Sequence, residues 1–271
     1  MSRLRVVTAN LLHGQALDGT VSESALRTAV HDIGADLLAI QEVDRLQPRS
    51  GGVDQTAVAA QAGGYVASRF VPAVFGTPGP GGTWRPAQVE DGALTDGPTY
   101  GLALLSRWPV RAWHVLRFPP SRVGLPLKVA GRPGLVVVPD EPRTALAAIV
   151  EGPDGLLTAA TAHLSFVPGR NVVQLRRIAQ WLRRYPGPHI LLGDLNLPGA
   201  VPSRTTGWHD LARTPTYPSW RPKIQWDHVL VDGETAPAVL DSAAVDLGFS
   251  DHLALRVDLE PAAWTPGPRE A

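Results

Sequence analysis

Cysteine is absent from the 271-residue chain, so disulfide bonds, thiolate metal ligands and thiol nucleophiles are excluded. Any bound metal ion must therefore be held by Asp, Glu, Asn, His or water. The chain also lacks a run of about 20 apolar residues, which is the length needed to cross a bilayer. A strand-like run directly follows the opening Met-Ser-Arg-Leu-Arg, without the apolar stretch of a signal peptide. We therefore expect a cytoplasmic protein with no membrane anchor.

An excess of basic charge is absent too, because 25 Lys and Arg residues balance 25 Asp and Glu residues. Proteins that grip long nucleic acid usually carry a basic excess, so binding to long duplex DNA is not favoured. A local basic cluster remains open, formed by Arg117, Arg122, Lys128, Arg132 and Arg143. Few lysines beside many Arg, Ala, Pro and Gly residues suggest a bacterial chain of high genomic GC content.

Two sequence signatures of other hydrolases are missing. The chain contains no Gly-x-Ser-x-Gly segment, which serine hydrolases use to present their nucleophile. It contains no Gly-x-x-x-x-Gly-Lys segment either, which P-loop nucleotidases use to cradle phosphates. Neither reaction class is therefore expected.

The pattern of apolar residues predicts many short strands and few helices. Helical periodicity with one apolar face covers 22–33, 53–62 and 170–184. Apolar runs bounded by turn residues predict strands at 3–9, 36–41, 101–106, 110–118, 144–150, 156–162, 189–192, 226–231 and 253–259. Because strands outnumber helices, a purely alternating βαβ fold is not expected.

The length fits one large domain, which we place at 1–261, followed by a flexible Pro-rich tail at 262–271. Three long segments interrupt the strands, at 76–98, 119–142 and 213–223. Such segments are either solvent-exposed connections or a rim that recognises substrate. The two interpretations have equal weight at this point. No feature of the sequence specifies an oligomeric state.

Polar side chains recur where the predicted strands end. These strand-end residues are Asn10, Glu42, His163, Asp194, Asn196, Asp227, Asp251 and His252. A single Asp or Asn after a strand is usually a turn residue or a helix cap. Six strand ends that each supply a group able to bind metal or phosphate are harder to explain by capping. The pattern instead indicates a site at one edge of the sheets.

Gly193-Asp194-Leu195-Asn196 is the most specific of these segments. On an extended chain, alternation would place the Asp194 carboxylate and the Asn196 amide on the same side. A carboxylate can orient or deprotonate water while an amide donates to a developing oxyanion, which suits a phosphoryl centre. Asp251 and His252 form the second strong element. Neighbours on a strand face opposite ways, so His252 needs another carboxylate to orient it, and Asp227 is the candidate.

Taken in order along residues 3–259, these motifs resemble the endonuclease/exonuclease/phosphatase superfamily, which includes deoxyribonuclease I. The matching segments are Thr-Ala-Asn at Asn10, Ile-Gln-Glu-Val at Glu42, Leu-Leu-Ser-Arg-Trp ending at Trp108, Thr-Ala-His-Leu at His163, Gly-Asp-Leu-Asn at 193–196, Trp-Asp-His-Val at 226–229 and Ser-Asp-His-Leu at 250–253. The resemblance implies an α/β (α+β) fold, a four-layer sandwich of two packed mixed β-sheets flanked by helices.

The resemblance also implies a role for each residue. Glu42 would be the main ligand of Mg²⁺ or Mn²⁺, with Asn10 and Asp251 completing or flanking that site. Asp194 would orient or deprotonate water. Asn196 and His163 would donate to phosphoryl oxygens, and His163 would supply positive charge to the leaving side. His252, paired with Asp227, would be a general base or a charge-stabilising imidazolium.

Some positions depart from the resemblance or allow two interpretations. His163 stands where abasic endonucleases typically have Tyr, so abasic-site cleavage is not favoured. Asp96 is the nearest substitute for the acidic residue that supports this His in deoxyribonuclease I-like proteins. Arg143 resembles an arginine that approaches phosphate, although an exposed, solubilising Arg is almost as good an interpretation. His228 should face away from Asp227 and be structural. Trp208, Tyr217 and Trp220 could stack on substrate or pack at the rim.

The sequence as a whole predicts a metal-dependent hydrolase that cleaves a phosphate ester by in-line attack of water, as a phosphodiesterase or a phosphatase. Its substrate would be a small molecule or a short nucleic acid. An endonuclease or exonuclease acting on DNA or RNA is the main alternative. A catalytically inactive binding relative is less favoured, because every expected polar position holds a competent residue.

Overall fold

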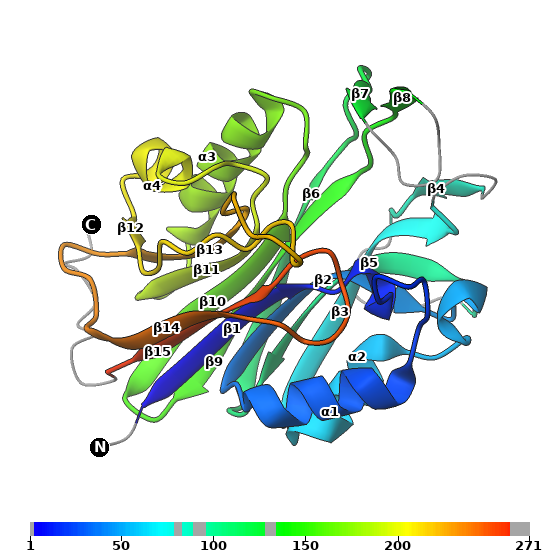
Figure 1. The fold of residues 1–271 in the computed structure, drawn as a ribbon. Helices are drawn as coiled ribbons and strands as arrows, with labels where there is room; N and C mark the ends of the chain where they lie inside the picture. Colours follow the sequence, from blue (N-terminus) through cyan, green and yellow to red (C-terminus); the bar gives the residue numbers. More distant parts are fainter. Residues whose placement is uncertain (1–2, 79–82, 89–95, 128–133, 261–271) are drawn as a thin grey trace.

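The computed structural model describes residues 3–78, 83–88, 96–127 and 134–260. Its strands form a seven-stranded sheet in the order β14-β15-β1-β2-β5-β3-β4 and a six-stranded sheet in the order β12-β13-β11-β10-β9-β6. A two-stranded sheet, β7-β8, stands apart. The two large sheets pack against each other, with α1 and α2 outside one and α3 and α4 outside the other (Figure 1). This confirms the predicted α+β sandwich.

The element bounds agree with most of the predicted runs. The first sheet contains β1 (Leu4–Asn10), β2 (Leu37–Arg45), β3 (Ala67–Gly76), β4 (Trp84–Pro86), β5 (Thr99–Ser106), β14 (Val239–Val245) and β15 (Ala254–Leu259). The second contains β6 (Val110–Phe118), β9 (Arg143–Gly152), β10 (Gly155–His163), β11 (His189–Asp194), β12 (His209–Asp210) and β13 (Asp227–Asp232). The small sheet pairs β7 (Leu125–Leu127) with β8 (Val136–Val138), and the helices are α1 (Glu23–Ile33), α2 (Gln55–Gly63), α3 (Arg170–Leu182) and α4 (Val201–Thr206), beside the 3₁₀ turns η1 (Leu12–Gly14) and η2 (Pro48–Ser50).

Alternate side chains along the central strands face different hydrophobic cores, one between the two sheets and one under the helices. In β1, Leu4 and Val6 face the core between the sheets, whereas Val7 and Ala9 face the core under α1 and α2. Successive side chains of a strand point to opposite faces, so a strand covered on both sides must be apolar at nearly every position. The central strands are therefore continuous apolar runs whose polar residues fall at the ends.

Six strands were not predicted: the short β4, β7, β8 and β12, and the longer β3 and β14. β3 contains Pro72, and proline inside a run argues against a central strand. Its pairing with β5 shifts register between Pro72 and Val74, so an irregularity accommodates the proline. β14 lies at the edge of its sheet and exposes Val239 and Leu240, so it lacks the apolar alternation of a buried strand.

The first and last strands of the described chain are neighbours, because β1 pairs antiparallel with β15 from Leu4↔Leu259 to Thr8↔Leu255. The predicted tail at 262–271 lies outside the described residues. Among the residues that the structure describes, no helix has both the length and the apolar character needed to cross a bilayer.

Candidate active site

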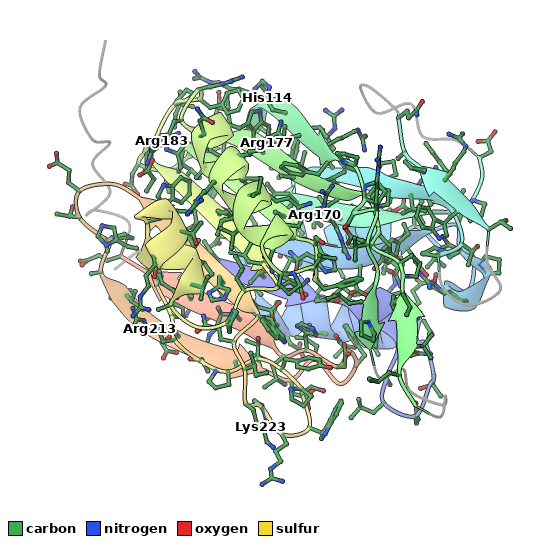
Figure 2. The ribbon with its side chains drawn as sticks, turned by 90° about the horizontal axis from the view of Figure 1, so that it is seen from above. His114, Arg170, Arg177, Arg183, Arg213 and Lys223 are labelled. Atoms are coloured by element: carbon green, nitrogen blue, oxygen red, sulfur yellow. The ribbon has the colours of Figure 1, made fainter. Side chains whose placement is uncertain are left out.

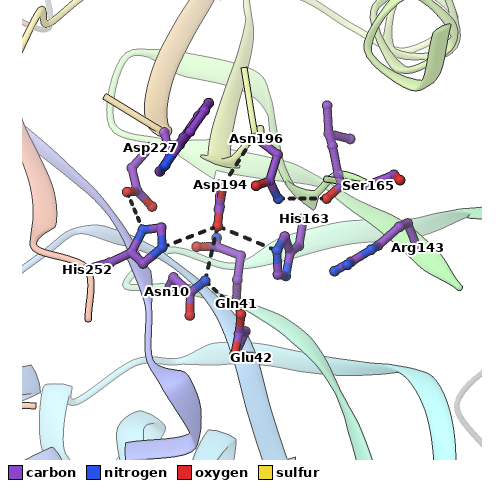
Figure 3. A network of polar contacts seen from close by, with 12 residues as sticks. Asn10, Gln41, Glu42, Arg143, His163, Ser165, Asp194, Asn196, Asp227 and His252 are labelled. Carbon is purple, nitrogen blue, oxygen red and sulfur yellow. Dashed lines mark hydrogen bonds and ion pairs between the residues drawn. The ribbon is translucent and has the colours of Figure 1, made fainter. Parts of the chain in front are cut away.

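The predicted strand-end residues gather at one edge of the sandwich. Asn10 ends β1, His163 ends β10 and Asp194 ends β11. β10 and β11 run parallel with His163 opposite Asp194, and antiparallel β13 begins with Asp227 opposite Asp194. Parallel strands deliver their last side chains to the same edge. The ladder pairing itself therefore brings these groups together, as Figure 3 shows.

Glu42 reaches this edge through a distortion of β2. The pairing of β2 with β5 shifts register between Ile40 and Val43, and Glu42 has φ 55°. A bulge inserts an extra residue and re-aims a side chain, and bulges are common next to active sites. A non-glycine residue in left-handed backbone geometry is strained by about 1–3 kcal/mol. We infer that the surrounding sheet holds Glu42 in this conformation to present its carboxylate.

Asp194 is the centre of the polar cluster. Its Oδ2 atom accepts a hydrogen bond from Asn10 Nδ2 at 3.1 Å and lies 3.5 Å from His163 Nε2 and 3.8 Å from His252 Nε2. The side chain is buried, and burial is the largest cause that raises the pKa of Asp194 to about 6. A carboxyl group whose pKa lies near neutral pH is suited to accept a proton from water.

Asp194 and Asn196 are not related by strand alternation, so that prediction was wrong. β11 ends at Asp194, and Asn196 has φ 48°, because the chain turns as soon as the ladder stops. The Asn196 N–H donates to Asp194 Oδ1 at 3.0 Å, and its Nδ2 donates to the Leu164 carbonyl at 2.9 Å. Asn171 Nδ2 in turn donates to the Asn196 carbonyl at 2.8 Å. The turn still leaves both side chains in the cluster (Figure 3).

His252 lies between two carboxylates. Its Nδ1 is 2.8 Å from Asp227 Oδ2, which is the pairing that the sequence predicted. Thr216 Oγ1 donates to the same oxygen at 2.6 Å, and the Tyr217 ring packs against the imidazole with centroids 4.9 Å apart. Burial is the largest influence and lowers the pKa of His252, but Asp227 and Asp194 outweigh it and raise the pKa to about 10. His252 is therefore an imidazolium at neutral pH in the metal-free protein.

The pKa of His163 argues against the expectation that this side chain supplies positive charge. Burial is the first cause, and the charges of Arg143 and His252 add to it, so the pKa of His163 lies well below its usual range. Asp96, the substitute proposed for its carboxylate partner, is exposed. The carboxylate that the structure places beside His163 is Asp194, at 3.5 Å. Positive charge in the cluster therefore comes from His252 and Arg143.

Arg143, the first residue of β9, is only 5% exposed, so the alternative of an exposed, solubilising Arg is wrong. Its guanidinium lies 5.8 Å from the Phe166 ring centroid, and its Nε is 3.9 Å from Asp140 Oδ1. It lies beyond His163 as seen from Asp194 (Figure 3). A buried guanidinium with one loosely placed counter-charge retains N–H donors for an anion.

The surroundings of Glu42 fit a divalent cation. Glu42 Oε1 accepts a hydrogen bond from Asn10 Nδ2 at 3.0 Å, whereas Asn10 Oδ1 accepts from the Leu12 N–H. Burial, together with the charges of Asp251 and Glu141, raises the pKa of Glu42 to about 7. A partly buried carboxylate with further acidic groups nearby gains stability from a cation, and hard oxygen ligands suit Mg²⁺ or Mn²⁺.

A second group, Asp194, Asp227 and His252, has ligand atoms that all lie within 4.8 Å of one another. The cation is assigned to Glu42 instead, because His252 Nδ1 already shares a hydrogen bond with Asp227, and that ring nitrogen is not free to bind a metal. Asp227 already has the His252 imidazole as its partner, whereas Glu42 accepts its hydrogen bond from the neutral Asn10 amide.

Several residues that support the site were not found from the sequence. Gln41 is fully buried and joins the sheets, because its Oε1 accepts from Thr8 Oγ1 and its Nε2 donates to Thr161 Oγ1. Thr216 orients Asp227 from a loop that carries no motif. His228 is structural, as predicted, since its Nε2 lies 2.8 Å from the Leu197 carbonyl. These contacts join residues distant in sequence, so no local signal marks them.

Gly193 is required by the close approach of β10 and β11 beside the cluster. A Cβ at this position would lie 2.0 Å from the Ala162 carbonyl oxygen. We expect Gly193→Ala to lower the free energy of unfolding by about 3 kcal/mol, at the upper end for overpacking, measured by urea denaturation. The control is Gly199→Ala, where φ is 52° but the space is open, with an expected loss of about 1 kcal/mol. Equal losses would contradict the steric explanation.

Carboxylates, imidazoles, an amide and a buried guanidinium at one edge of a two-sheet sandwich are groups suited to binding and hydrolysing a phosphate ester. The sequence profile of the Endonuclease/Exonuclease/phosphatase family matches residues 7–252. The chain belongs to this family of phosphoester hydrolases. A comparison with curated protein sequences finds no match.

Solved structures share the fold. An endonuclease/exonuclease/phosphatase from Beutenbergia cavernae has 23% sequence identity and a TM-score of 0.64, with 98% of this chain and 72% of that chain covered. The catalytic domain of human Nocturnin has 19% identity and a TM-score of 0.58, covering 97% and 95%. A mannosyl-6-phosphatase from Bacteroides thetaiotaomicron has 16% identity and a TM-score of 0.56, covering 95% and 99%.

Proposed function

We propose that the protein is a divalent-metal-dependent phosphodiesterase or phosphatase that cleaves a phosphate ester of a small molecule or a short nucleic acid. The observation that carries the proposal is the convergence on Asp194 Oδ2 of Asn10, His163 and His252, which come from different strand ends. A carboxylate between an imidazolium and a neutral imidazole can take a proton from water while its neighbours donate to a phosphoryl group.

The pKa values of Asp194 and His252 are both raised but lie on opposite sides of neutral pH, which distinguishes the roles of the two groups. Sites that run acid–base chemistry push the pKa values of neighbouring groups apart. Asp194, with its pKa raised to about 6, is the group that orients and deprotonates water. His252, with its pKa raised to about 10 and its Nδ1 oriented by Asp227, donates a charged N–H. Of the two roles that the sequence left open for His252, the charge-stabilising imidazolium is therefore preferred.

The remaining residues bind the phosphate and the cation. Neutral His163 can donate one ring N–H, Asn196 lies beside it, and Arg143 supplies fixed positive charge to the phosphate. Glu42 would hold Mg²⁺ or Mn²⁺, with Asn10 and Asp251 flanking it. When bound, such an ion polarises the phosphoryl group and neutralises charge on the leaving oxygen.

Hydrolysis of two model substrates tests the proposal, with bis-p-nitrophenyl phosphate reporting on a diesterase and p-nitrophenyl phosphate on a monoesterase. We expect p-nitrophenolate release with Mg²⁺ or Mn²⁺ and background rates in EDTA. Asp194→Asn, which keeps size but cannot take a proton, should lower the rate about 100-fold. Release that persists in EDTA would contradict metal dependence, and a wild-type rate for Asp194→Asn would contradict the assigned base.

A nuclease is the second candidate, because the family includes endonucleases and exonucleases and Arg143 can bind any phosphate. A short fluorescent single-stranded DNA or RNA distinguishes the candidates under the same metal conditions. Cleavage of the oligonucleotide with a higher kcat/KM than the model esters would favour the nuclease.

A further inference from the structure

A pocket of about 330 Å³ lies beside the catalytic cluster. One side is the turn that follows η1, with Leu17 and Asp18, and the other is the 213–223 loop, with Trp220. Its base is the segment from Asp246 to Ser250, which directly precedes Asp251 and His252. None of its residues has a role in the chemistry described above.

Hydrogen bonds join the pocket walls to the catalytic segment. The Ser219 N–H donates to the Asp251 carbonyl at 2.7 Å, and Ser219 Oγ donates to the Ser250 carbonyl at 2.9 Å. From the other wall, the Gln15 carbonyl accepts from the Ser250 N–H at 2.7 Å. Tyr217, in the same loop as Trp220, packs on the His252 ring. The loop that carries Trp220 therefore also contacts the His252 imidazole, and the pocket lies next to the segment that holds this side chain.

The pocket exposes two large apolar side chains although most such residues of the protein are buried. Trp220 is 62% exposed and Leu17 is 64% exposed, whereas Phe249 is 3% exposed at the base. An exposed indole beside an active site offers a ring face on which a ligand can pack. The loop therefore presents Trp220 to solvent on the side of the pocket.

The charge of the pocket is negative. Asp18 and Asp246 line it, and no Lys or Arg is among its described lining residues. Hydrogen bonds from Thr20 lower the pKa of Asp18, so this carboxylate is ionised at neutral pH. Arg221 and Lys223 follow Trp220 in the loop but lie outside the lining, and Figure 2 shows Lys223 extending away from the body of the protein.

We propose that this pocket binds an organic cation esterified to the phosphate that the enzyme cleaves, as in the phosphate esters of amino alcohols. A cation packs favourably over an indole face, and two carboxylates at one pocket provide the complementary charge. The same carboxylates repel the additional phosphates of a nucleic acid. The proposal rests on the proposed function, because it places the phosphate of the ligand at the catalytic cluster.

Titration calorimetry with two isosteric ligands tests the proposal. Choline phosphate carries a trimethylammonium group, and 3,3-dimethylbutyl phosphate carries a neutral tert-butyl group of the same shape. Binding is measured on the Asp194→Asn protein with Mn²⁺, so that turnover does not consume the ligand. We expect choline phosphate to bind about tenfold more tightly, as one cation–π contact with a charge pair would give.

Trp220→Ala and Asp246→Asn should each remove most of this preference. Two control variants should keep the preference for choline phosphate. Leu240→Ala truncates another exposed apolar residue, on β14. Asp154→Asn neutralises an exposed carboxylate in the β9–β10 turn. Equal affinities for the two isosteres, no binding of choline phosphate, or tighter binding of a dinucleotide would each overturn the proposal.

Hydrolysis of bis-p-nitrophenyl phosphate by the unsubstituted protein is measured separately. Preference for the cation without any metal-dependent hydrolysis would support the pocket and contradict the proposed function. Hydrolysis without preference for the cation would support the function and overturn the pocket.

Discussion

His252→Ala is expected to lower kcat for a phosphate ester by about 10²–10³-fold, the range for removing one donor that stabilises developing charge. Its Nε2 points to the Asp194 carboxylate at 3.8 Å, while Nδ1 is bound to Asp227 at 2.8 Å. Alanine removes both the positive charge and the donor. We expect the change in kcat rather than in KM, because this donor stabilises the charge of the phosphoryl group more in the transition state than in the ground state.

The measurement is steady-state hydrolysis at saturating Mn²⁺, with circular dichroism to verify that the variant is folded. His31→Ala is the matched control, since its side chain is 78% exposed and lies on α1. His228→Ala should instead destabilise the protein, because His228 is fully buried and its ring lies 2.8 Å from the Leu197 carbonyl. Any loss of activity in this variant should follow from the loss of folded protein. Wild-type kcat in His252→Ala would contradict its role.

The elements that sequence patterns predict best are those fixed by local chemistry. α1 begins after Ser22, whose Oγ accepts from the Ala25 N–H at 3.2 Å, and ends at Gly34 with φ 57°. Both signals belong to the helix itself. β6 was predicted with the bounds it has. β3 and β14 were missed because their stability depends on neighbouring strands, and a strand with Pro72 or with an exposed face gives no clear pattern of its own.

The site, too, has features that the sequence predicts and features that it does not. The strand-end positions of Asn10, His163 and Asp194 follow from where apolar runs stop, and strand pairing then brings them together. The backbone of Glu42 and Asn196, with φ of 55° and 48°, does not follow from the sequence, because only the surrounding sheet imposes it. The resemblance to a known family supplied the predicted roles, and the structure shows which of these side chains contact one another.

Charge states were the least predictable feature. His163 and His252 look alike in sequence, since each ends or precedes an apolar run. Burial beside Arg143 lowers the pKa of His163, whereas Asp227 and Asp194 raise the pKa of His252. The two imidazoles therefore differ in charge because of neighbours brought to them by other strands. Such neighbours become visible only when the fold is known.

Glu42→Gln is expected to abolish metal-dependent hydrolysis, with a decrease of about 10³-fold or more, because the amide has no charge to hold a divalent ion. Glutamine keeps the size of the side chain and can still accept the hydrogen bond from Asn10 Nδ2. Calorimetry should show that Mn²⁺ binding to the variant is lost or greatly weakened. Glu234→Gln, in the exposed loop after β13, is the control and should retain both properties.

The same substitution should stabilise the metal-free protein at high pH. Burial raises the pKa of Glu42 from 4.5 to about 7, so in EDTA the carboxyl contributes full stability below its unfolded pKa. That stability is lost as the pH rises through the folded value. Glutamine cannot ionise. The free energy of unfolding of Glu42→Gln should therefore exceed that of the wild type by about 1–2 kcal/mol at pH 8 in EDTA, after allowance for solvent screening. The difference should vanish at pH 4.

Adding Mn²⁺ at pH 8 should make the wild type more stable than Glu42→Gln, because an ion that binds only the folded wild type stabilises it by RT ln(1 + c/Kd), where c is the concentration of free Mn²⁺. The unfolding temperature of the wild type should rise with Mn²⁺ concentration, while that of Glu42→Gln stays constant. If Mn²⁺ raises the unfolding temperature of both proteins equally, the ion binds elsewhere, and the group of Asp194, Asp227 and His252 becomes the site to test. If neither gains, Glu42 does not hold a cation, and its strained position at the cluster would need another explanation.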